Sequence, residues 1–186
     1  MANKTGKEID ILVDIEHDGP IPGEYSMVEL GASVIWEPDI EPFHVIIQPL
    51  HDHYDLETQK FLDGVGLTRE VARNGDLPLR AMERFDFWVN LHTGYGHDRP
   101  VFVHFGGKDW SFVDWYFWKF LAHNPFGVSA CDLKSMTRGV LKCSWAQTSK
   151  SRMPKELRPT LPHTHHAHED AMEHAERFRK LWDYEK

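Results

Sequence analysis

The sequence of 186 residues lacks long apolar runs and has very little cysteine. No segment reaches the roughly 18 apolar residues of a membrane-spanning helix, and the first residues contain no apolar stretch of signal-peptide length. Cys131 and Cys143 are the only cysteines, and their spacing matches no metal-binding motif. These absences argue against a membrane protein and a disulfide-stabilised secreted protein. We therefore expect a cytoplasmic protein with reduced thiols.

Positive charge is also scarce, since the formal net charge is −8 at pH 7. Phosphate binding normally draws on Lys and Arg, so the total argues against a nucleic-acid partner. The distribution is uneven, however, because residues 134–158 hold seven basic residues against the single acidic residue Glu156. This basic segment is either a solvated loop or a surface for phosphate groups.

Hydrophobic residues make up 41% of the sequence, enough for a substantial core in one domain over residues 1–186. Apolar patterning predicts strands over residues 9–16, 26–35, 43–48, 100–105 and 128–133. It predicts helices over residues 55–62, 78–92, 110–121, 134–141 and 166–183. Short turns join the first three strands, which indicates an antiparallel meander, and helices then alternate with strands. We expect one α/β domain with a mixed sheet, against which the aromatic run WSFVDWYFWKFL packs.

The apolar run IDILVDIE, residues 9–16, ends in two carboxylates. Residues i and i+2 of a strand point to the same face, so Asp14 and Glu16 project together. Two adjacent buried carboxylates repel each other, and a divalent cation that prefers oxygen ligands, Mg²⁺ or Mn²⁺, removes that repulsion. Such pairs are also common at solvated strand ends, so a metal site needs partners elsewhere in the chain.

Two later segments offer such partners. Asp109 follows a strand and a Gly-Gly turn, at the sheet edge where α/β proteins bind ligands. Asp114 is the competing choice for this metal ligand. Alternatively, Asp109 only caps the helix that follows. Asp170 lies in a run rich in histidine, in which only His166 has the i, i+4 spacing to it on a regular helix. This run is a zinc or nickel ligand set, an exposed tract, or the source of a general base beside a metal-binding carboxylate.

Taken in order, DIE at 14–16, Asp109 after its turn, and HxAxxDA at 165–171 resemble the DEDDh 3′–5′ exonucleases. The longer segments DIEHDGPIPGEYSM, HFGGKDWSFVDWYF, PFGVSACDLKS and MPKELRPTLPHTHHAHEDA are similar to a smaller group, typified by a mycobacterial exoribonuclease, and to related phage exonucleases. The similarity covers nearly the whole chain. It implies a ribonuclease H-like fold with a mixed five-stranded sheet flanked by helices.

The resemblance also implies the roles of five side chains. Asp14, Glu16, Asp109 and Asp170 are expected to bind two divalent cations, Mg²⁺ or Mn²⁺. His165, on the loop before the last helix, takes the place of general base in preference to His166. The implied reaction is hydrolysis of the terminal phosphodiester to release nucleoside 5′-monophosphates from a 3′ end.

Three departures from the family pattern concern the substrate. His17 stands where Thr or Ser is common, Phe105 where Asn is common, and Lys108 where Phe is usual. These residues and Met27 are our candidates for binding the terminal nucleotide of a single strand or 3′ overhang. We expect the basic segment to bind the upstream phosphates.

The resemblance further suggests partners. Relatives lean towards RNA and the phage proteins act on DNA, so RNA is mildly favoured. Relatives are often homodimers, and we expect the same here. The alternatives are a nucleic-acid-binding module on the same fold without turnover and a histidine-rich zinc-binding interaction protein.

Overall fold

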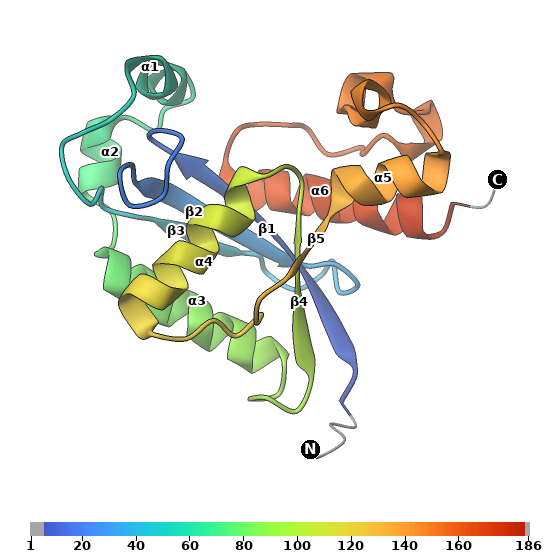
Figure 1. Ribbon diagram of the computed structural model, residues 1–186, viewed down its shortest axis with the longest axis horizontal. Helices are drawn as coiled ribbons and strands as arrows, with labels where there is room; N and C mark the ends of the chain where they lie inside the picture. The colour runs from blue at the N-terminus through green and yellow to red at the C-terminus, as the bar shows by residue number, and fades with distance from the viewer. Residues whose placement is uncertain (1–5, 185–186) are drawn as a thin grey trace.

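The computed structural model describes residues 6–184, and a five-stranded mixed sheet in the order β3-β2-β1-β4-β5 forms its centre (Figure 1). The strands are β1 (Glu8–His17), β2 (Met27–Val34), β3 (Phe43–Ile46), β4 (Arg99–His104) and β5 (Ala130–Asp132). β1, β2 and β3 pair antiparallel, whereas β4 pairs in parallel with both β1 and β5. The predicted meander and the mixed five-stranded sheet are confirmed.

The helices are α1 (Leu56–Gly64), α2 (Arg69–Arg73), α3 (Pro78–His92), α4 (Lys108–Leu121), α5 (Leu133–Leu141) and α6 (Ala167–Trp182). Local sequence sets several starts: Asp55 caps α1 by accepting the Thr58 N–H, Asp132 caps α5, and Pro78 opens α3. Short 3₁₀ turns at Trp145–Thr148, Lys150–Arg152 and Lys155–Leu157 occupy much of the basic segment.

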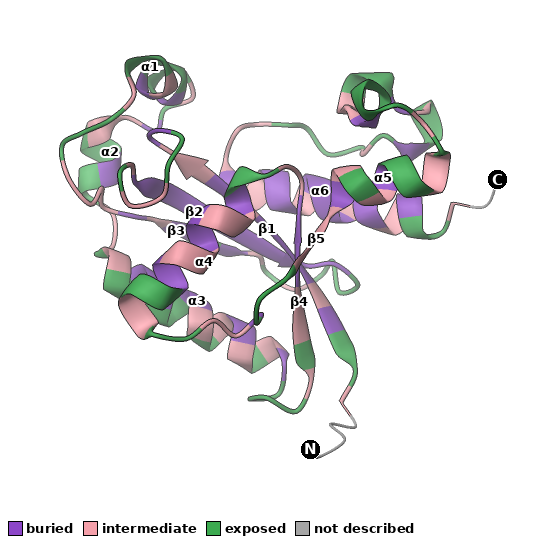
Figure 2. Ribbon diagram, viewed as in Figure 1, coloured by how far each residue is buried: buried purple, intermediate pink, exposed green. Residues whose placement is uncertain are grey.

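Two layers of helices cover the sheet, α3 and α4 on one face and α5 and α6 on the other (Figure 2). Because side chains alternate along a strand, β1 serves both layers. Val13 packs with Phe85 of α3 and Phe112 of α4, whereas Leu12 packs with Phe178 of α6. The aromatic segment forms α4 and packs on the sheet as predicted. Among the described residues, no helix is long and apolar enough to cross a membrane.

The start of α6 lies against the middle of β2, and a glycine permits this approach. A Cβ atom on Gly31 would lie 2.2 Å from both the carbonyl carbon of Ala167 and the backbone nitrogen of His168. Any larger residue at this position must displace α6 from the sheet. Gly31 thus sets the height at which the first turn of α6 lies above β1 and β2.

Candidate active site

Asp14 and Glu16 lie near the C-terminal end of β1, the central strand of the sheet. They alternate with the buried Val13 and Ile15, which face α3 and α4. The two carboxylates therefore project from the same face as Leu12, towards α6. The predicted common direction of Asp14 and Glu16 follows from this pleat.

Asp170 reaches the same place from the first turn of α6. Its carboxylate is almost fully buried and accepts the backbone N–H groups of Thr164 and His165, at 2.9 and 3.1 Å. Oxygen atoms of Asp14, Glu16 and Asp170 all lie within 4.8 Å of one another. Three carboxylates from two segments that are remote in sequence thus converge at one end of β1.

Asp109 lies beside this group, in the first turn of α4. Its carboxylate accepts the backbone N–H of Ile15 and lies 3.7 Å from Nδ1 of His104. Among neighbouring charges, Asp109 acts most strongly on Asp14. The competing residue, Asp114, instead accepts a hydrogen bond from Asn124 at 2.8 Å. The structure therefore brings Asp109, and not Asp114, next to Asp14.

Burial and mutual repulsion raise the pKa values of these carboxyl groups. Desolvation raises the pKa of Asp14 well above its usual value, and the charges of Asp109, Glu16 and Asp170 raise it further. Desolvation, followed by the charge of Glu29, raises the pKa of Glu16 to about 8. Desolvation also raises the pKa of Asp109. A cluster of buried carboxylate oxygens with this excess of negative charge suits hard divalent cations.

His165 lies on the loop before α6, in the left-handed backbone region with φ of 59°. Its ring packs edge-on against Phe61 and His163, with centroid distances of 4.8 and 4.2 Å. Desolvation and the neighbouring His163 lower its pKa, which favours the neutral ring that accepts a proton. His166 turns elsewhere, and its Nδ1 lies 4.0 Å from Glu29.

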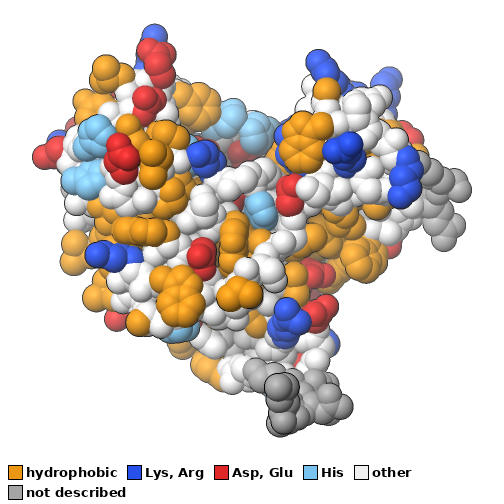
Figure 3. All heavy atoms as spheres, viewed as in Figure 1, with side chains coloured by type: hydrophobic (Ala, Val, Ile, Leu, Met, Phe, Trp, Pro, Cys, Tyr) orange, Lys and Arg blue, Asp and Glu red, His pale blue; other side chains and the backbone are white. Residues whose placement is uncertain are grey.

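The carboxylate pocket is the cavity of about 350 Å³ around Asp14, Glu16, His165 and Asp170, and Asp109 lies outside its lining. Its lining residues come from β1, the loop after β4, the basic segment, the loop before α6, and α6: Asp14, Ile15, Glu16, Phe105, Lys150, His163, His165, Asp170, His174 and Arg177. In Figure 3 it belongs to the hollow between the projections of α1 and of the 3₁₀ turns, where histidine side chains gather.

The sequence pattern did not predict Glu173 and Arg177 near the carboxylates, and it indicated His163 and Lys150 only as members of the histidine-rich run and the basic segment. Nδ1 of His163 lies 3.0 Å from Asp170 and 2.9 Å from Glu173, which also pairs with Lys150. Arg177 is fully buried over the ring of Phe105, 4.3 Å away, and its guanidinium nitrogens have no hydrogen-bond partner among the described residues. The signal was available, because residues 170, 173 and 177 share one face of a helix.

Of the four residues expected to bind the terminal nucleotide, one lines the carboxylate pocket and three lie elsewhere. Phe105 lines the carboxylate pocket. Met27 is fully buried in the core with α4, where its backbone N–H donates to the hydroxyl of Tyr116, and its side chain has no exposed surface for a substrate. His17 stacks on Phe112, with centroids 5.0 Å apart, and Lys108 donates to the carbonyl of Pro20. Of this set, only Phe105 lines the pocket.

Known proteins share sequence and fold with this chain. No family model matches the chain. The curated 3′–5′ DNA exonuclease Cap18 of Escherichia coli is 38% identical over 180 residues, 96% of this chain and 94% of that protein.

Solved structures resemble this chain at lower sequence identity. The nuclease domain of 3′hExo, a DEDDh family member bound to rAMP, has a TM-score of 0.73 at 14% identity, covering 96% of this chain and 94% of that one. E. coli exonuclease I in complex with a dA16 oligonucleotide has a TM-score of 0.55 at 15% identity, covering 71% of this chain and 29% of that one. The predicted ribonuclease H-like fold is confirmed.

Proposed function

Because the chain belongs to the DEDDh family of 3′–5′ exonucleases, we propose that it removes nucleotides from single-stranded 3′ ends of DNA by metal-assisted hydrolysis. The observation that carries this proposal is the convergence of Asp14, Glu16 and Asp170 in the pocket that His165 also lines. Asp14 and Glu16 are desolvated and repel each other, which is costly in a fold, and bound cations would remove this cost.

The donor set fits divalent cations. Asp14, Glu16, Asp109 and Asp170 would hold two ions, Mg²⁺ or Mn²⁺, which when bound make water more acidic and stabilise charge on the scissile phosphate and the leaving 3′-oxygen. The ring of His165 accepts the proton of the attacking water, since its lowered pKa keeps it neutral. A new P–O bond forms to the water oxygen, the bond to the 3′-oxygen breaks, and a nucleoside 5′-monophosphate leaves.

The cationic side chains of the pocket contribute to binding. Lys150 and Arg177 are the positive residues in the lining, and both lie beside Glu173. We assign the non-bridging oxygens of the substrate phosphates to Lys150, whose side chain is partly exposed, because an ammonium group binds phosphate through charge-assisted hydrogen bonds. Arg177 is fully buried and contributes its positive charge from beneath the pocket. Phe105, under Arg177, offers the apolar surface nearest to the carboxylates.

The name of a relative supports our proposal for the sugar of the substrate. The E. coli relative at 38% identity is named a DNA exonuclease, which favours deoxyribose over the ribose that the sequence motifs mildly suggested. The fold accepts both, since 3′hExo carries rAMP and exonuclease I carries a dA16 oligonucleotide. The RNA preference expected from the sequence is not confirmed, whereas the homodimer, the cytoplasmic location and the single domain over residues 1–186 stay predictions.

Digestion of matched DNA and RNA oligomers tests the proposal. Each sequence is offered as a 5′-labelled single strand and as a 3′ overhang, with Mg²⁺ or Mn²⁺ and with excess chelator. We expect metal-dependent shortening from the 3′ end, faster on DNA, and a decrease of at least ~10³-fold in Asp14→Asn, because a cation ligand stabilises the transition state by several kcal/mol. Asp39→Asn, at an exposed carboxylate outside the pocket, is the matched control and should retain full activity.

Three outcomes count against parts of this proposal. Shortening that persists in Asp14→Asn or in chelator contradicts the metal-assisted mechanism. Binding without shortening under both cations supports instead a nucleic-acid-binding module without turnover. Faster digestion of RNA reverses the assignment of the sugar and leaves the site unchanged.

A further inference from the structure

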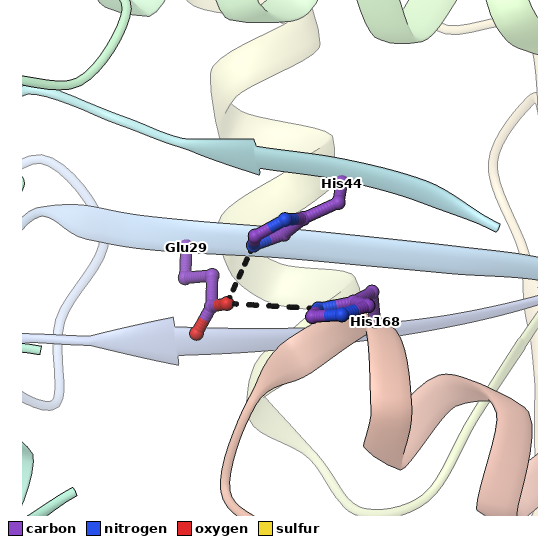
Figure 4. A group of neighbouring side chains, drawn as sticks. All are labelled: Glu29, His44 and His168. Atoms are coloured by element: carbon purple, nitrogen blue, oxygen red, sulfur yellow. Dashed lines mark hydrogen bonds and ion pairs between the residues drawn. The ribbon is translucent and has the colours of Figure 1, made fainter. Parts of the chain in front are cut away.

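A second group of potential metal ligands lies outside the carboxylate pocket. It consists of Glu29 of β2, His44 of β3 and His168 of α6 (Figure 4). Nε2 of His44 lies 2.7 Å from Oε1 of Glu29, and Nδ1 of His168 lies 4.0 Å from the same oxygen. The two imidazole rings stack, with centroids 4.0 Å apart. None of the three residues lines the carboxylate pocket, although Glu29 faces Glu16 across the β1–β2 ladder.

The group contains polar atoms that the fold leaves unsatisfied. The side chain of Glu29 is fully buried, and its Oε2 has no hydrogen-bond partner among the described residues. Nδ1 of His168 is likewise buried without one. A buried polar atom without a partner costs about 1–3 kcal/mol, and more when it is charged. Because the two atoms belong to the same group of side chains, a single bound ligand or ion could satisfy both.

We propose that Glu29, His44 and His168 bind a zinc ion that joins β2, β3 and the start of α6. Two imidazole nitrogens and one carboxylate oxygen form a common three-residue zinc ligand set, with the fourth position left for water or another ligand. Nδ1 of His166, 4.0 Å from Oε1 of Glu29, is close to this position. Imidazole nitrogens favour zinc over Mg²⁺ and Mn²⁺, so this site and the carboxylate pocket select different cations.

The geometry requires little movement. Ligand atoms of a tetrahedral zinc ion lie about 3.3 Å apart, given bond lengths of ~2.0–2.2 Å. The ligand atoms of the three residues already lie within 4.8 Å of one another. The hydrogen bond between His44 and Glu29 lengthens by several tenths of an ångström, and the ring of His168 moves towards the carboxylate.

Such an ion has a structural consequence for the carboxylate pocket. His168 lies two residues before Asp170 in the same first turn of α6. A zinc ion bound to His168 therefore holds this turn against β2, at the point where Gly31 allows close approach. Because three distant segments share the ion, its binding free energy adds to the stability of the folded state.

Zinc binding by the full chain, purified without a nickel column or histidine tag and dialysed against chelator, tests this inference. His44→Ala is the informative variant, since His44 lies on the edge strand β3 with 37% of its side chain exposed and folding should tolerate the change. His123→Ala is the matched control, because His123 pairs with Asp86 at 2.9 Å on the surface without a third ligand. Zinc stoichiometry and affinity are measured by calorimetry, with circular dichroism to verify folding.

We expect His44→Ala to bind one zinc ion fewer than the wild type and His123→Ala, or to bind that ion at least ten-fold more weakly. The melting temperature should rise with zinc in the wild type and in His123→Ala, and less in His44→Ala. The same comparison in an Asp14→Asn/His163→Ala background removes zinc bound at the carboxylate pocket. Equal zinc binding by the His44 and His123 variants in both backgrounds overturns the proposal, and His44→Gln repeats the test should His44→Ala fail to fold.

Discussion

Glu16 shows how burial and repulsion combine at a single residue. Desolvation is the largest cause of the raised pKa of its carboxyl group, and the charges of Glu29, Asp170 and Asp109 raise this pKa further. In the absence of cations the folded state therefore holds a proton that the unfolded state releases at ordinary pH. The metal-free protein and the cation-loaded protein should consequently respond to pH in opposite ways.

In the metal-free protein, the contribution of Glu16 to stability should fall between about pH 5 and 8, while histidines with lowered pKa values, such as His165 and His174, act in the opposite direction. The pKa of Glu16 is raised from 4.5 to about 8 by folding, so its contribution is complete below the unfolded value and disappears as the pH rises through the folded value. The expected decrease is on the order of a few kcal/mol in the free energy of unfolding, measured by urea denaturation in chelator. Glu16→Gln should flatten this dependence in part, since Asp14 titrates in the same direction.

A slope that Glu16→Gln leaves unchanged contradicts the prediction, because the histidines with lowered pKa values respond to pH alike in both proteins. Asp39→Asn serves as the control here too, because its exposed carboxylate should leave the slope as it is. Added Mg²⁺ or Mn²⁺ should restore stability most at the upper end of the range, where deprotonated ligands bind best.

At the scale of elements, α6 determines whether the carboxylates meet. Its packing against β2 depends on Gly31, so Gly31→Ala should push the first turn of α6 away from the sheet. We expect a decrease of about 1–3 kcal/mol in stability and a larger effect on nuclease activity, because Asp170 moves with the helix. Denaturation midpoints and cleavage rates of the same preparations measure both.

Gly64→Ala is the matched control for this substitution. Gly64 ends α1, and a Cβ there meets no atom within 4 Å. Alanine favours helix over glycine, so this variant should be neutral or slightly more stable, with normal cleavage. Equal behaviour of the two variants would mean that the close approach of α6 to β2 has no part in forming the site.

The sequence predicted most elements because their periodicity is strong. α3 has the predicted bounds, and β1 differs by one residue at each end. α2 went unpredicted, since its five residues are too few for a helical period. α4 begins at Lys108, two residues before the predicted start, which places Asp109 inside the helix instead of in the turn before it.

The candidate site was predictable where strand alternation alone decides direction, as for Asp14 and Glu16. The place of Glu29 beside Glu16 depends on the β1–β2 register, which has an irregularity between Glu16 and His17 that no local pattern reveals. Met27 was expected near the substrate but is buried against α4, because its burial follows from the packing of a distant helix. Direction along a strand is local information, whereas register and packing are not.

At the scale of the whole molecule, an acidic chain has to attract a polyanion. The basic segment, residues 134–158, reaches the carboxylate pocket through Lys150, which pairs with Glu173. Part of its charge has a structural use, since Arg158 donates hydrogen bonds to the carbonyls of Met153 and Ser151. Arg152 and Lys155 are exposed on the 3₁₀ turns, and we expect them to meet upstream phosphates.

Reversal of these two charges, in Arg152→Glu/Lys155→Glu, should raise the KM for a long single strand by roughly ten-fold. Each phosphate that is no longer neutralised lowers the salt dependence of single-strand binding by ~0.7 in the log–log slope, so the pair should lower it by about 1.4. The kcat should change little, because both residues lie outside the carboxylate pocket. A dinucleotide has no upstream phosphates, and its hydrolysis should be almost unaffected.

Arg80→Glu/Lys119→Glu separates local guidance from net charge. Both residues are exposed on α3 and α4, across the sheet from α6, and the double variant changes the net charge by the same amount. If the basic segment guides the strand, this control keeps the KM near the wild-type value at ~0.15 M salt, where the Debye length is about 8 Å. Equal increases in KM for the two double variants would instead assign the effect to overall repulsion, and the basic segment would then be a solvated surface without a part in binding.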